Sequence, residues 1–225
     1  ILALADVWLA IASGELHALI GPNGAGKTTL INLVTGELAP AAGRVRLKSR
    51  DVTRLPVPAR ARLGLGRTFQ LTSILPSFGV LENVALAAQA GRAKGGGFLR
   101  DALRDPDLVT AADAALVQVG LVALADQPAQ SLSHGQKRRL ELAMVLVGEP
   151  AVLLLDEPLG ALDLKLRREM QVELKRIQTE VGLTFIHVTH DQEEAMTMAD
   201  TVAVMNGGRI EQMGAPEELY DLPGT

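Results

Sequence analysis

The stretch LIGPNGAGKTTLI, residues 19 to 31, has the residue types and the spacing that phosphate binding needs. Gly21 is followed after four residues by Gly26, Lys27 and Thr28, with a short apolar run before them and a helical pattern after them. In such a P-loop the backbone N–H groups wrap the phosphates, the lysine reaches the terminal groups and the threonine hydroxyl ligates Mg²⁺. The predicted nucleotide cradle comprises Gly21, Pro22, Asn23, Gly24, Ala25, Gly26, Lys27, Thr28 and Thr29.

A second stretch, SLSHGQKRRLELAM at residues 131 to 144, has the composition of another anion-binding turn. Ser133 is placed to cap a helix, Gly135 permits close backbone approach, and three basic residues follow. Because a helix N-terminus binds an anion directly in front of it, one nucleotide does not obviously touch both turns. The sequence therefore raises the question of which anion the second turn serves.

Acidic residues follow the apolar run AVLLL, where ligands collect in open parallel sheets. Asp156 comes directly after the run and is predicted to hold the hydration shell of Mg²⁺, and Glu157 is a candidate to deprotonate an attacking water. Alternatively, Asp156 and Glu157 are simply polar residues at the end of a strand, but the presence of a P-loop makes this interpretation less favoured. His190 follows the run LTFIHV in the same way, whereas His187 and His17 lie within apolar runs and are interpreted as packed core residues.

The elements that must position these residues alternate along the chain. The apolar runs typical of buried strands are ELHALI (15 to 20), AVLLL (151 to 155), LTFIHV (183 to 188) and TVAVM (201 to 205). KTTLINLVTG predicts a helix that ends at Gly36. A longer helix, ending at Gly182, is predicted from one apolar face: Leu166, Met170, Leu174, Ile177 and Val181. This βαβ series predicts an α/β domain with a mostly parallel sheet.

The stretch from about 72 to 147 has no strand-like run and predicts helices, with a Gly-rich interruption at GRAKGGG. We interpret it as a helical subdomain inserted into a core that comprises residues 1–71 and 148–225. The 225 residues, 48% of them hydrophobic, then form a single domain with a sizeable buried core.

Composition argues against several classes of function. A net charge of −4 and 3% aromatic residues give neither the basic surface nor the stacking rings of a nucleic-acid binder. Without cysteine there are no disulfides and no thiolate metal sites, which is compatible with a reducing compartment. No apolar run is long enough to span a membrane and no signal peptide is evident. The first residue, Ile1, and the ending DLPGT suggest that both ends were trimmed from something longer.

Taken in order, several motifs carry a family resemblance: Gly21 to Thr29, Gln70 in RTFQ, LSHGQ at 132 to 136, LLLDEP at 153 to 158, ALD at 161 to 163, and His190 in VTHD. Together they resemble the nucleotide-binding subunit of an ATP-binding cassette (ABC) transporter over essentially the whole chain. The resemblance implies a RecA-like P-loop NTPase fold with a parallel-sheet core, an inserted helical subdomain and N-terminal β elements. It also implies ATP hydrolysis with Mg²⁺ and a cytoplasmic location, peripheral on the inner face of the cell membrane, beside transmembrane permease subunits.

The same resemblance assigns roles to single residues. Glu157 would be the catalytic base and His190 the γ-phosphate contact. Gln70 would sense Mg²⁺ and water, so that the implied metal residues are Thr28, Gln70 and Asp156.

Cassettes of this family pair head to tail as homodimers or heterodimers, with Asp163 linking the two. The signature turn, here Ser133, Gly135 and Gln136, closes on the γ-phosphate held by the other subunit, which answers the question of the second anion. The segment LPSFGVLENV would lie near the groove for a membrane-subunit helix, although an ordinary surface turn and helix start explains it equally well.

The sequence departs from the family pattern at three places. His134 replaces the usual glycine of the signature and is interpreted as a tolerated surface residue. Trp8 lies within an expected strand, ADVWLAI, and is interpreted as packing, so the aromatic platform for adenine is missing and ATP binding is expected to be weak. Up to about Glu157 the sequence resembles the ATPases of branched-chain amino acid or urea importers. After Glu157 it resembles the ATPases of maltose-type sugar, polyamine and iron importers. This seam suggests a recombinant or engineered chimera.

Two alternatives stay open at this point. A DNA-repair or chromosome-maintenance ATPase shares the motifs but needs long heptad arms between Gln70 and Ser133, which the sequence lacks. A chimeric scaffold that folds with weak or no turnover is the stronger rival.

Overall fold

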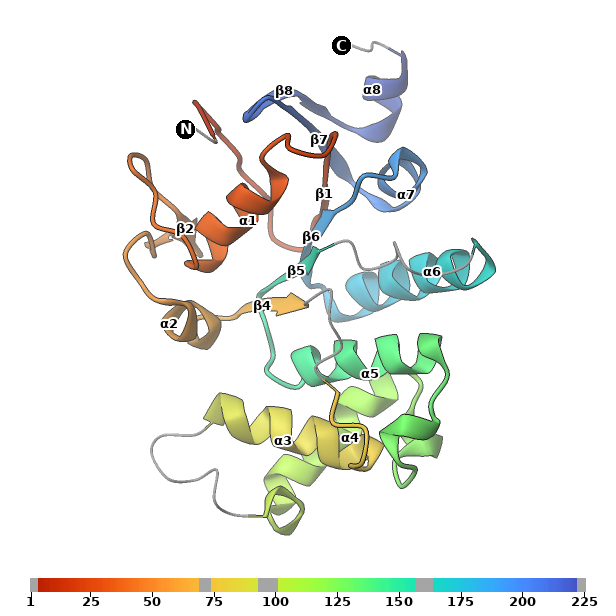
Figure 1. Ribbon diagram of the computed structural model, residues 1–225. Coiled ribbons are helices and arrows are strands. Elements are labelled where there is room, and N and C mark those ends of the chain that lie inside the picture. The colour runs from red at the N-terminus through yellow and green to blue at the C-terminus, as the bar shows by residue number, and fades with distance from the viewer. Residues whose placement is uncertain (1–3, 69–73, 93–100, 157–163, 222–225) are drawn as a thin grey trace.

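A twisted sheet of six strands forms the centre of the computed structural model, which describes residues 4–68, 74–92, 101–156 and 164–221 (Figure 1). Within these residues the strand order is β4-β5-β6-β1-β7-β8. All neighbours are parallel except β7 and β8. The strands are β1 Leu16–Ile20, β4 Leu65–Thr68, β5 Val152–Asp156, β6 Thr184–Val188, β7 Thr201–Asn206 and β8 Arg209–Gly214. A separate hairpin pairs β2, Arg46–Leu47, with β3, Arg50–Asp51.

Helices cover both faces of the sheet, as parallel strands require. Their bounds are α1 Lys27–Thr35, α2 Val57–Arg62, α3 Val80–Arg92, α4 Pro106–Gln118, α5 His134–Leu146, α6 Leu164–Val181, α7 Gln192–Met198 and α8 Pro216–Asp221. Short 3-10 turns are η2 Ala102–Arg104, η3 Val122–Leu124 and η4 Ala129–Ser131.

The alternation of side chains along β5 separates two apolar layers. Leu154 belongs to the cluster that contains Ile31 of α1. Leu153 belongs to the opposite cluster, with Leu140 of α5 and Met170 of α6. The helix that follows the P-loop and the helix that follows the second turn therefore pack on opposite faces of the sheet.

Helices α3, α4 and α5 gather at one end of the molecule, away from β7, β8 and both chain termini (Figure 1). Their buried residues, among them Val84, Leu116 and Leu140, are continuous with the layer under β5. Asp105 caps α4, since its Oδ1 accepts hydrogen bonds from the N–H groups of Asp107 and Leu108. These helices occupy the stretch interpreted as an inserted subdomain, and its division from the core stays a prediction.

The α/β class with a parallel-sheet core is confirmed. The four strand-like runs became β1, β5, β6 and β7, and the first predicted helix became α1, which ends at Gly36. The long helix α6 buries Met170, Leu174 and Ile177 as expected and ends before Gly182. At its last turn Val181 is 38% exposed, which differs from the expected face.

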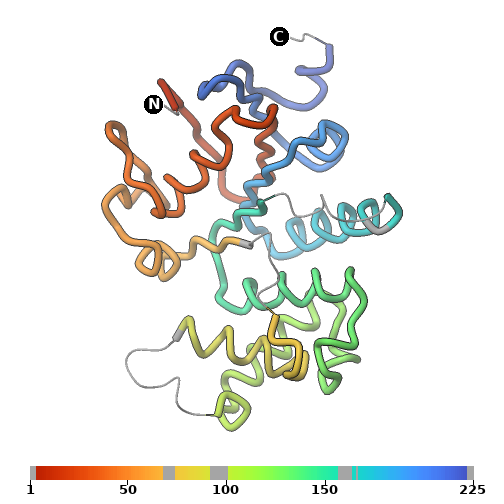
Figure 2. Tube along the Cα trace, viewed as in Figure 1, coloured from red at the N-terminus to blue at the C-terminus, as the bar shows by residue number. Residues whose placement is uncertain are grey.

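The interpretation of the ADVWLAI stretch was wrong. Residues 5–11 do not form a strand, and the Trp8 side chain is 87% exposed. Leu9 and Ile11 pack against the α1 layer, so the side chains alternate in an extended segment whose outward position is Trp8. The segment is held beside β8 by a hydrogen bond from Ala5 N–H to the Gly208 carbonyl, and it is the N-terminal part of the trace in Figure 2.

No helix among the described residues is both long and apolar enough to cross a lipid bilayer.

Candidate nucleotide and metal site

The P-loop occupies the turn between β1 and α1. Gly26 precedes the helix with a φ of 105°, a conformation that glycine adopts at little cost, and α1 begins at Lys27. Gly21 lies so close to β7 that an added Cβ would meet the Met205 carbonyl oxygen at 2.1 Å. The first N–H groups of α1 have no acceptor within the helix and carry its positive dipole end. The turn is thus shaped to bind phosphate.

Lys27 lies under this loop. Its side chain is buried, and its Nζ donates to the carbonyl oxygens of Gly21 at 2.6 Å and Pro22 at 3.1 Å. These contacts keep the ammonium at the concave side of the turn, where phosphate oxygens would replace the carbonyls. Thr28 follows in the first helical turn and is exposed, so its hydroxyl is accessible to a metal ion.

Asp156 and His190 are brought to the same edge of the sheet as the P-loop. Asp156, the last residue of β5, pairs in register with Val188 of β6, and Val188 pairs with Leu19 of β1. Because the three strands are parallel and adjacent, their carboxyl ends lie together. His190 follows β6 by two residues and is exposed. The sequence prediction that these residues converge is therefore supported by the sheet register.

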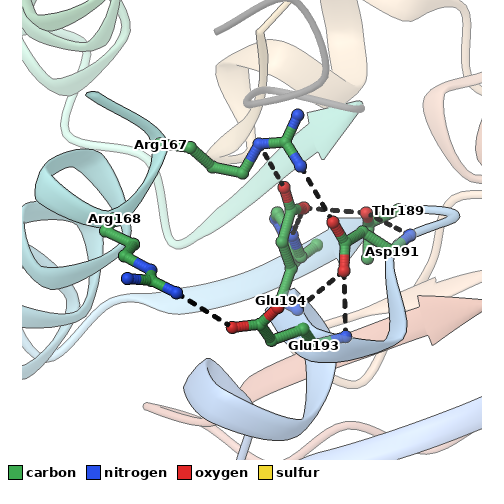
Figure 3. A network of polar contacts seen from close by, with 7 residues as sticks. Arg167, Arg168, Thr189, Asp191, Glu193 and Glu194 are labelled. Atoms are coloured by element: carbon green, nitrogen blue, oxygen red, sulfur yellow. Dashed lines mark hydrogen bonds and ion pairs between the residues drawn. The ribbon is translucent and has the colours of Figure 1, made fainter. Parts of the chain in front are cut away.

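The loop that carries His190 is fixed on both sides by polar contacts (Figure 3). Thr189 Oγ1 donates to Glu194 Oε2 at 2.8 Å and accepts from the Asp191 N–H at 3.0 Å. Asp191 caps α7 and accepts a hydrogen bond at 3.0 Å from Arg167 of α6. Arg167 also lies 3.7 Å from Glu194. The network ties the start of α6 to the turn that presents His190.

Glu194 is the buried anion of this network, with a side chain only 2% exposed. Burial acts on its pKa most strongly and would raise it. The hydrogen bonds from His187 and Thr189, with the charges of His187 and Arg167, outweigh burial and lower the pKa below its ordinary value. His187 is itself fully buried, as is His17 beside Glu15, so both histidines are core residues as predicted.

The residues present fit an Mg²⁺ ion held together with a nucleotide. In the described part of the chain no three His, Asp or Glu side chains gather to form a metal site by themselves. Mg²⁺ rarely uses such a cage and is bound through one or two protein oxygens, waters and substrate phosphates. Asp156 and the Thr28 hydroxyl are oxygen donors of this kind.

The second turn begins α5. Ser133 Oγ accepts from the Gln136 N–H at 3.3 Å, and Gln136 Oε1 accepts from the Ser133 N–H at 2.8 Å, which completes a capping box. The capping role predicted for Ser133 is confirmed. His134 is exposed and Gly135 is buried. The turn lies on the helix layer opposite α1, so the structure does not bring it to the P-loop of its own chain.

Three predicted site residues, Gln70, Glu157 and Asp163, lie outside the described residues.

Sequence reasoning also missed two arginines. Arg67 of β4 contacts Asp156 at 2.9 Å. Arg60 of α2 is 1% exposed and donates to the Leu33 and Val34 carbonyls at the end of α1, at 2.7 and 2.6 Å. The motif RTFQ places Arg67 three residues before Gln70, so the sequence could have indicated that Arg67 lies near the site. No sequence pattern indicated the role of Arg60.

Comparison with known proteins gives consistent relatives. The family model for ABC transporters matches residues 4–160. The spermidine/putrescine import ATP-binding protein PotA of Frankia alni is 47% identical over 223 residues, which cover 99% of this chain and 45% of that protein. The chain spans about half the length of the curated relatives it matches.

Solved structures agree with this assignment. An ATP-binding cassette of an ABC transporter, MJ1267 in its ADP conformation, superposes with a TM-score of 0.87 at 28% identity, over 98% of this chain and 89% of that one. The cassette MJ0796, solved as a dimer in a post-hydrolysis state with ADP and Pi, gives 0.75 at 27% identity, over 95% and 90% of the two chains.

The relatives give no support to the chimera hypothesis. A single curated protein aligns with 99% of the chain, on both sides of the seam suspected near Glu157. With the P-loop between β1 and α1, Asp156 at the end of β5 and a family model that matches most of the chain, the chain belongs to the ABC transporter family.

Proposed function

We propose that this chain is the ATP-binding and ATP-hydrolysing cassette of an ABC importer. The observation that carries the proposal is the convergence of the P-loop, Asp156 and His190 at one edge of the parallel sheet. The Frankia alni relative is a spermidine/putrescine import ATP-binding protein, which supports import as the direction of transport. The transported solute would be selected by other subunits.

In this proposal the P-loop binds the phosphates of ATP. The N–H groups of residues 23 to 29 would surround the β-phosphate, and Lys27 would exchange its two carbonyl partners for phosphate oxygens. Thr28 and Asp156 would hold Mg²⁺, with Gln70 as a further oxygen donor. When bound, Mg²⁺ neutralises charge on the β- and γ-phosphates.

For hydrolysis, Glu157 accepts a proton from a water molecule that attacks the γ-phosphorus. The bond from the γ-phosphorus to the bridging oxygen then breaks, and ADP leaves with the electron pair. His190 contacts the γ-phosphate from the end of β6, on a loop that Thr189 and Asp191 hold in place. Glu157 and Gln70 are assigned by family resemblance alone.

We further propose that two cassettes bind ATP between them. The capped N-terminus of α5 lies on the layer of helices opposite α1, so a phosphate bound there would come from another chain. Ser133, Gly135 and Gln136 would close on the partner's γ-phosphate, and Asp163 would link the two chains. The dimeric state of the related cassette MJ0796 supports this arrangement. The partner is a second copy or a homologous subunit.

The membrane subunits would bind this cassette on the inner face of the cell membrane. Leu75 and Phe78, which precede α3, are 43% and 37% exposed and offer apolar contacts to a permease helix. In this proposal the protein is a cytoplasmic, peripheral component of the membrane complex.

Turnover separates a working ATPase from an inactive scaffold. The purified protein should release phosphate from ATP only when Mg²⁺ is present. Glu157→Gln should retain ATP binding and lose phosphate release by at least a hundredfold, because a neutral amide cannot accept the proton of water. Phosphate release at the wild-type rate in Glu157→Gln would refute the assignment of the base, and no release by wild type would favour the scaffold.

A further inference from the structure

Arg67 lies between two carboxylates at the edge of the proposed metal site. Its Nη2 is 2.9 Å from Asp156 Oδ2, and its Nη1 is 2.6 Å from Glu37 Oε1 and 3.1 Å from Asn32 Oδ1. The Arg67 and Asp156 side chains are 14% and 16% exposed, whereas Glu37 is 39% exposed. One guanidinium thus joins the carboxylate at the end of β5 to the residue just beyond α1.

The sheet register produces this contact. Arg67 pairs with Leu154 across β4 and β5, and Asp156 lies two residues after Leu154. Because strand side chains alternate between faces, Arg67, Leu154 and Asp156 all point to the face covered by α1. Glu37 follows Gly36, the residue at which α1 ends, and so lies on the same side of the sheet.

The charges of the three groups determine what the contact does. An arginine bonded to a single aspartate would cancel the negative charge that attracts a cation. Glu37 supplies a second negative charge to the same guanidinium, so that one arginine is shared between two acids. Among the described residues only Arg67 hydrogen-bonds to Asp156, and only at Oδ2. Arg67 thus leaves Oδ1 without a bond from its guanidinium, so that this oxygen could serve a metal ion.

We propose that Glu37, acting through Arg67, sets how tightly Asp156 holds the Mg²⁺ of the bound nucleotide. The inference rests on the proposed function. Arg67 is a positioning residue, because it holds the Asp156 carboxylate in place. The negative charge of Glu37 acts on Asp156 through the Arg67 guanidinium. Glu37 is not among the residues proposed to hold the nucleotide or the metal, and it acts through its contact with Arg67. Outer partners of this kind typically change metal affinity tenfold to a hundredfold when they are removed.

The direction of the effect follows from the charges. In Glu37→Gln the guanidinium loses the negative charge of Glu37 and neutralises Asp156 more fully. We expect the Mg²⁺ concentration needed for half-maximal tightening of ADP binding to rise about tenfold. The affinity for ADP in EDTA should not change, because the P-loop contacts are untouched.

The decisive test is a double-mutant cycle in which ADP binding is titrated with Mg²⁺ and with EDTA as reference. Glu37→Gln should raise the Mg²⁺ midpoint in the wild-type background and leave it unchanged in Arg67→Met, because the route from Glu37 to Asp156 has been removed. Glu211→Gln, an exposed carboxylate on β8, removes the same charge and should leave the midpoint at the wild-type value.

Each result has a distinct meaning. A Glu37→Gln midpoint equal to that of wild type and Glu211→Gln overturns this inference alone. An equal shift in the Arg67→Met background also overturns it, because Glu37 would then act without Arg67. If wild type shows no Mg²⁺-dependent ADP binding, the proposed function falls together with the inference. Should Arg67→Met fail to fold, the comparison of Glu37→Gln with Glu211→Gln still decides.

Discussion

Lys27 donates a hydrogen bond at 2.6 Å to the carbonyl oxygen of Gly21, the first glycine of its own loop. The side chain therefore closes the P-loop on itself, with a second bond to Pro22. These partners belong to the loop rather than to the core, which gives the lysine little part in holding the sheet together. Its positive charge lies where the phosphates are proposed to bind.

Lys27→Ala should therefore abolish nucleotide binding without unfolding the protein. We expect ATP affinity, measured by equilibrium dialysis, to fall at least a hundredfold, because the charge that contacts the phosphates is lost. The urea midpoint should change little. Lys165→Ala, an exposed lysine at the start of α6, serves as the control with unchanged affinity. Wild-type ATP affinity in Lys27→Ala would contradict the P-loop assignment.

The lowered pKa of Glu194 predicts how the free energy of unfolding depends on pH. Its pKa is lower in the folded protein than in the unfolded chain, so its charged form contributes stability above about pH 4.3, the ordinary value for glutamate. That contribution is lost as the pH falls through the folded-state pKa. Glu194→Gln should therefore lower the free energy of unfolding by about 3 kcal/mol at pH 7, and the difference should shrink below about pH 4.3.

Urea titrations at several pH values measure this difference. Glu193→Gln is the matched control, since the Glu193 side chain is 73% exposed and its pairing distance to Arg168 is 3.9 Å. An exposed pair of this kind is worth less than about 1 kcal/mol. A loss of stability in Glu194→Gln that stayed constant from pH 7 to pH 3 would show that the carboxylate charge is not the cause.

Arg60 closes the far end of the P-loop helix. Besides the Leu33 and Val34 carbonyls, it donates to those of Leu55 and Thr53, both at 2.9 Å. Arg60→Leu would leave these part-buried acceptors without their donor, at a cost of up to about 1 to 3 kcal/mol for each unpaired group. We expect a loss of at least about 3 kcal/mol in the free energy of unfolding, measured in urea.

Arg62→Leu, on the same helix, tests whether this loss is specific. Arg62 is exposed, and within the described part of the chain its side chain bonds only to the Pro58 carbonyl, at 3.2 Å. Its replacement should change stability by less than about 0.5 kcal/mol. Equal losses for the two arginines would mean that charge or helix propensity, and not the carbonyls that Arg60 binds, explains the result.

Local patterns predicted the parts of this fold that depend on neighbouring residues. The apolar runs gave β1, β5, β6 and β7, and the capping of α5 by Ser133 followed from its spacing to Gln136. Contacts between distant segments were not predictable in this way. Arg67 meets Asp156 because β4 pairs with β5, although 89 residues separate them in sequence.

The errors have a similar origin. Trp8 lies in an apolar stretch, but the side that each residue takes depends on what packs against the segment, and Leu9 and Ile11 face the core instead. The strand β4, LGRT, is short and half polar, so its sequence does not mark it as part of a sheet. Its place in the sheet is set by pairing with β5.

The central claim is that the turn at Ser133 binds the nucleotide of a partner chain. Glu157→Gln, which should hold ATP without hydrolysing it, makes such a dimer long-lived. Adding Ser133→Arg replaces the capping hydroxyl with bulk and a cation at the dimer interface, and leaves the P-loop intact. Ser131→Arg, at an exposed serine just before the turn, introduces the same side chain outside the capping box.

Light scattering of these variants with ATP, beside a measurement of ATP binding, tests the claim most directly. Glu157→Gln and its combination with Ser131→Arg should double in mass when ATP is added, whereas the combination with Ser133→Arg should bind ATP and stay monomeric. A Ser133→Arg combination that still dimerises, or Glu157→Gln that stays monomeric with ATP bound, would contradict the account.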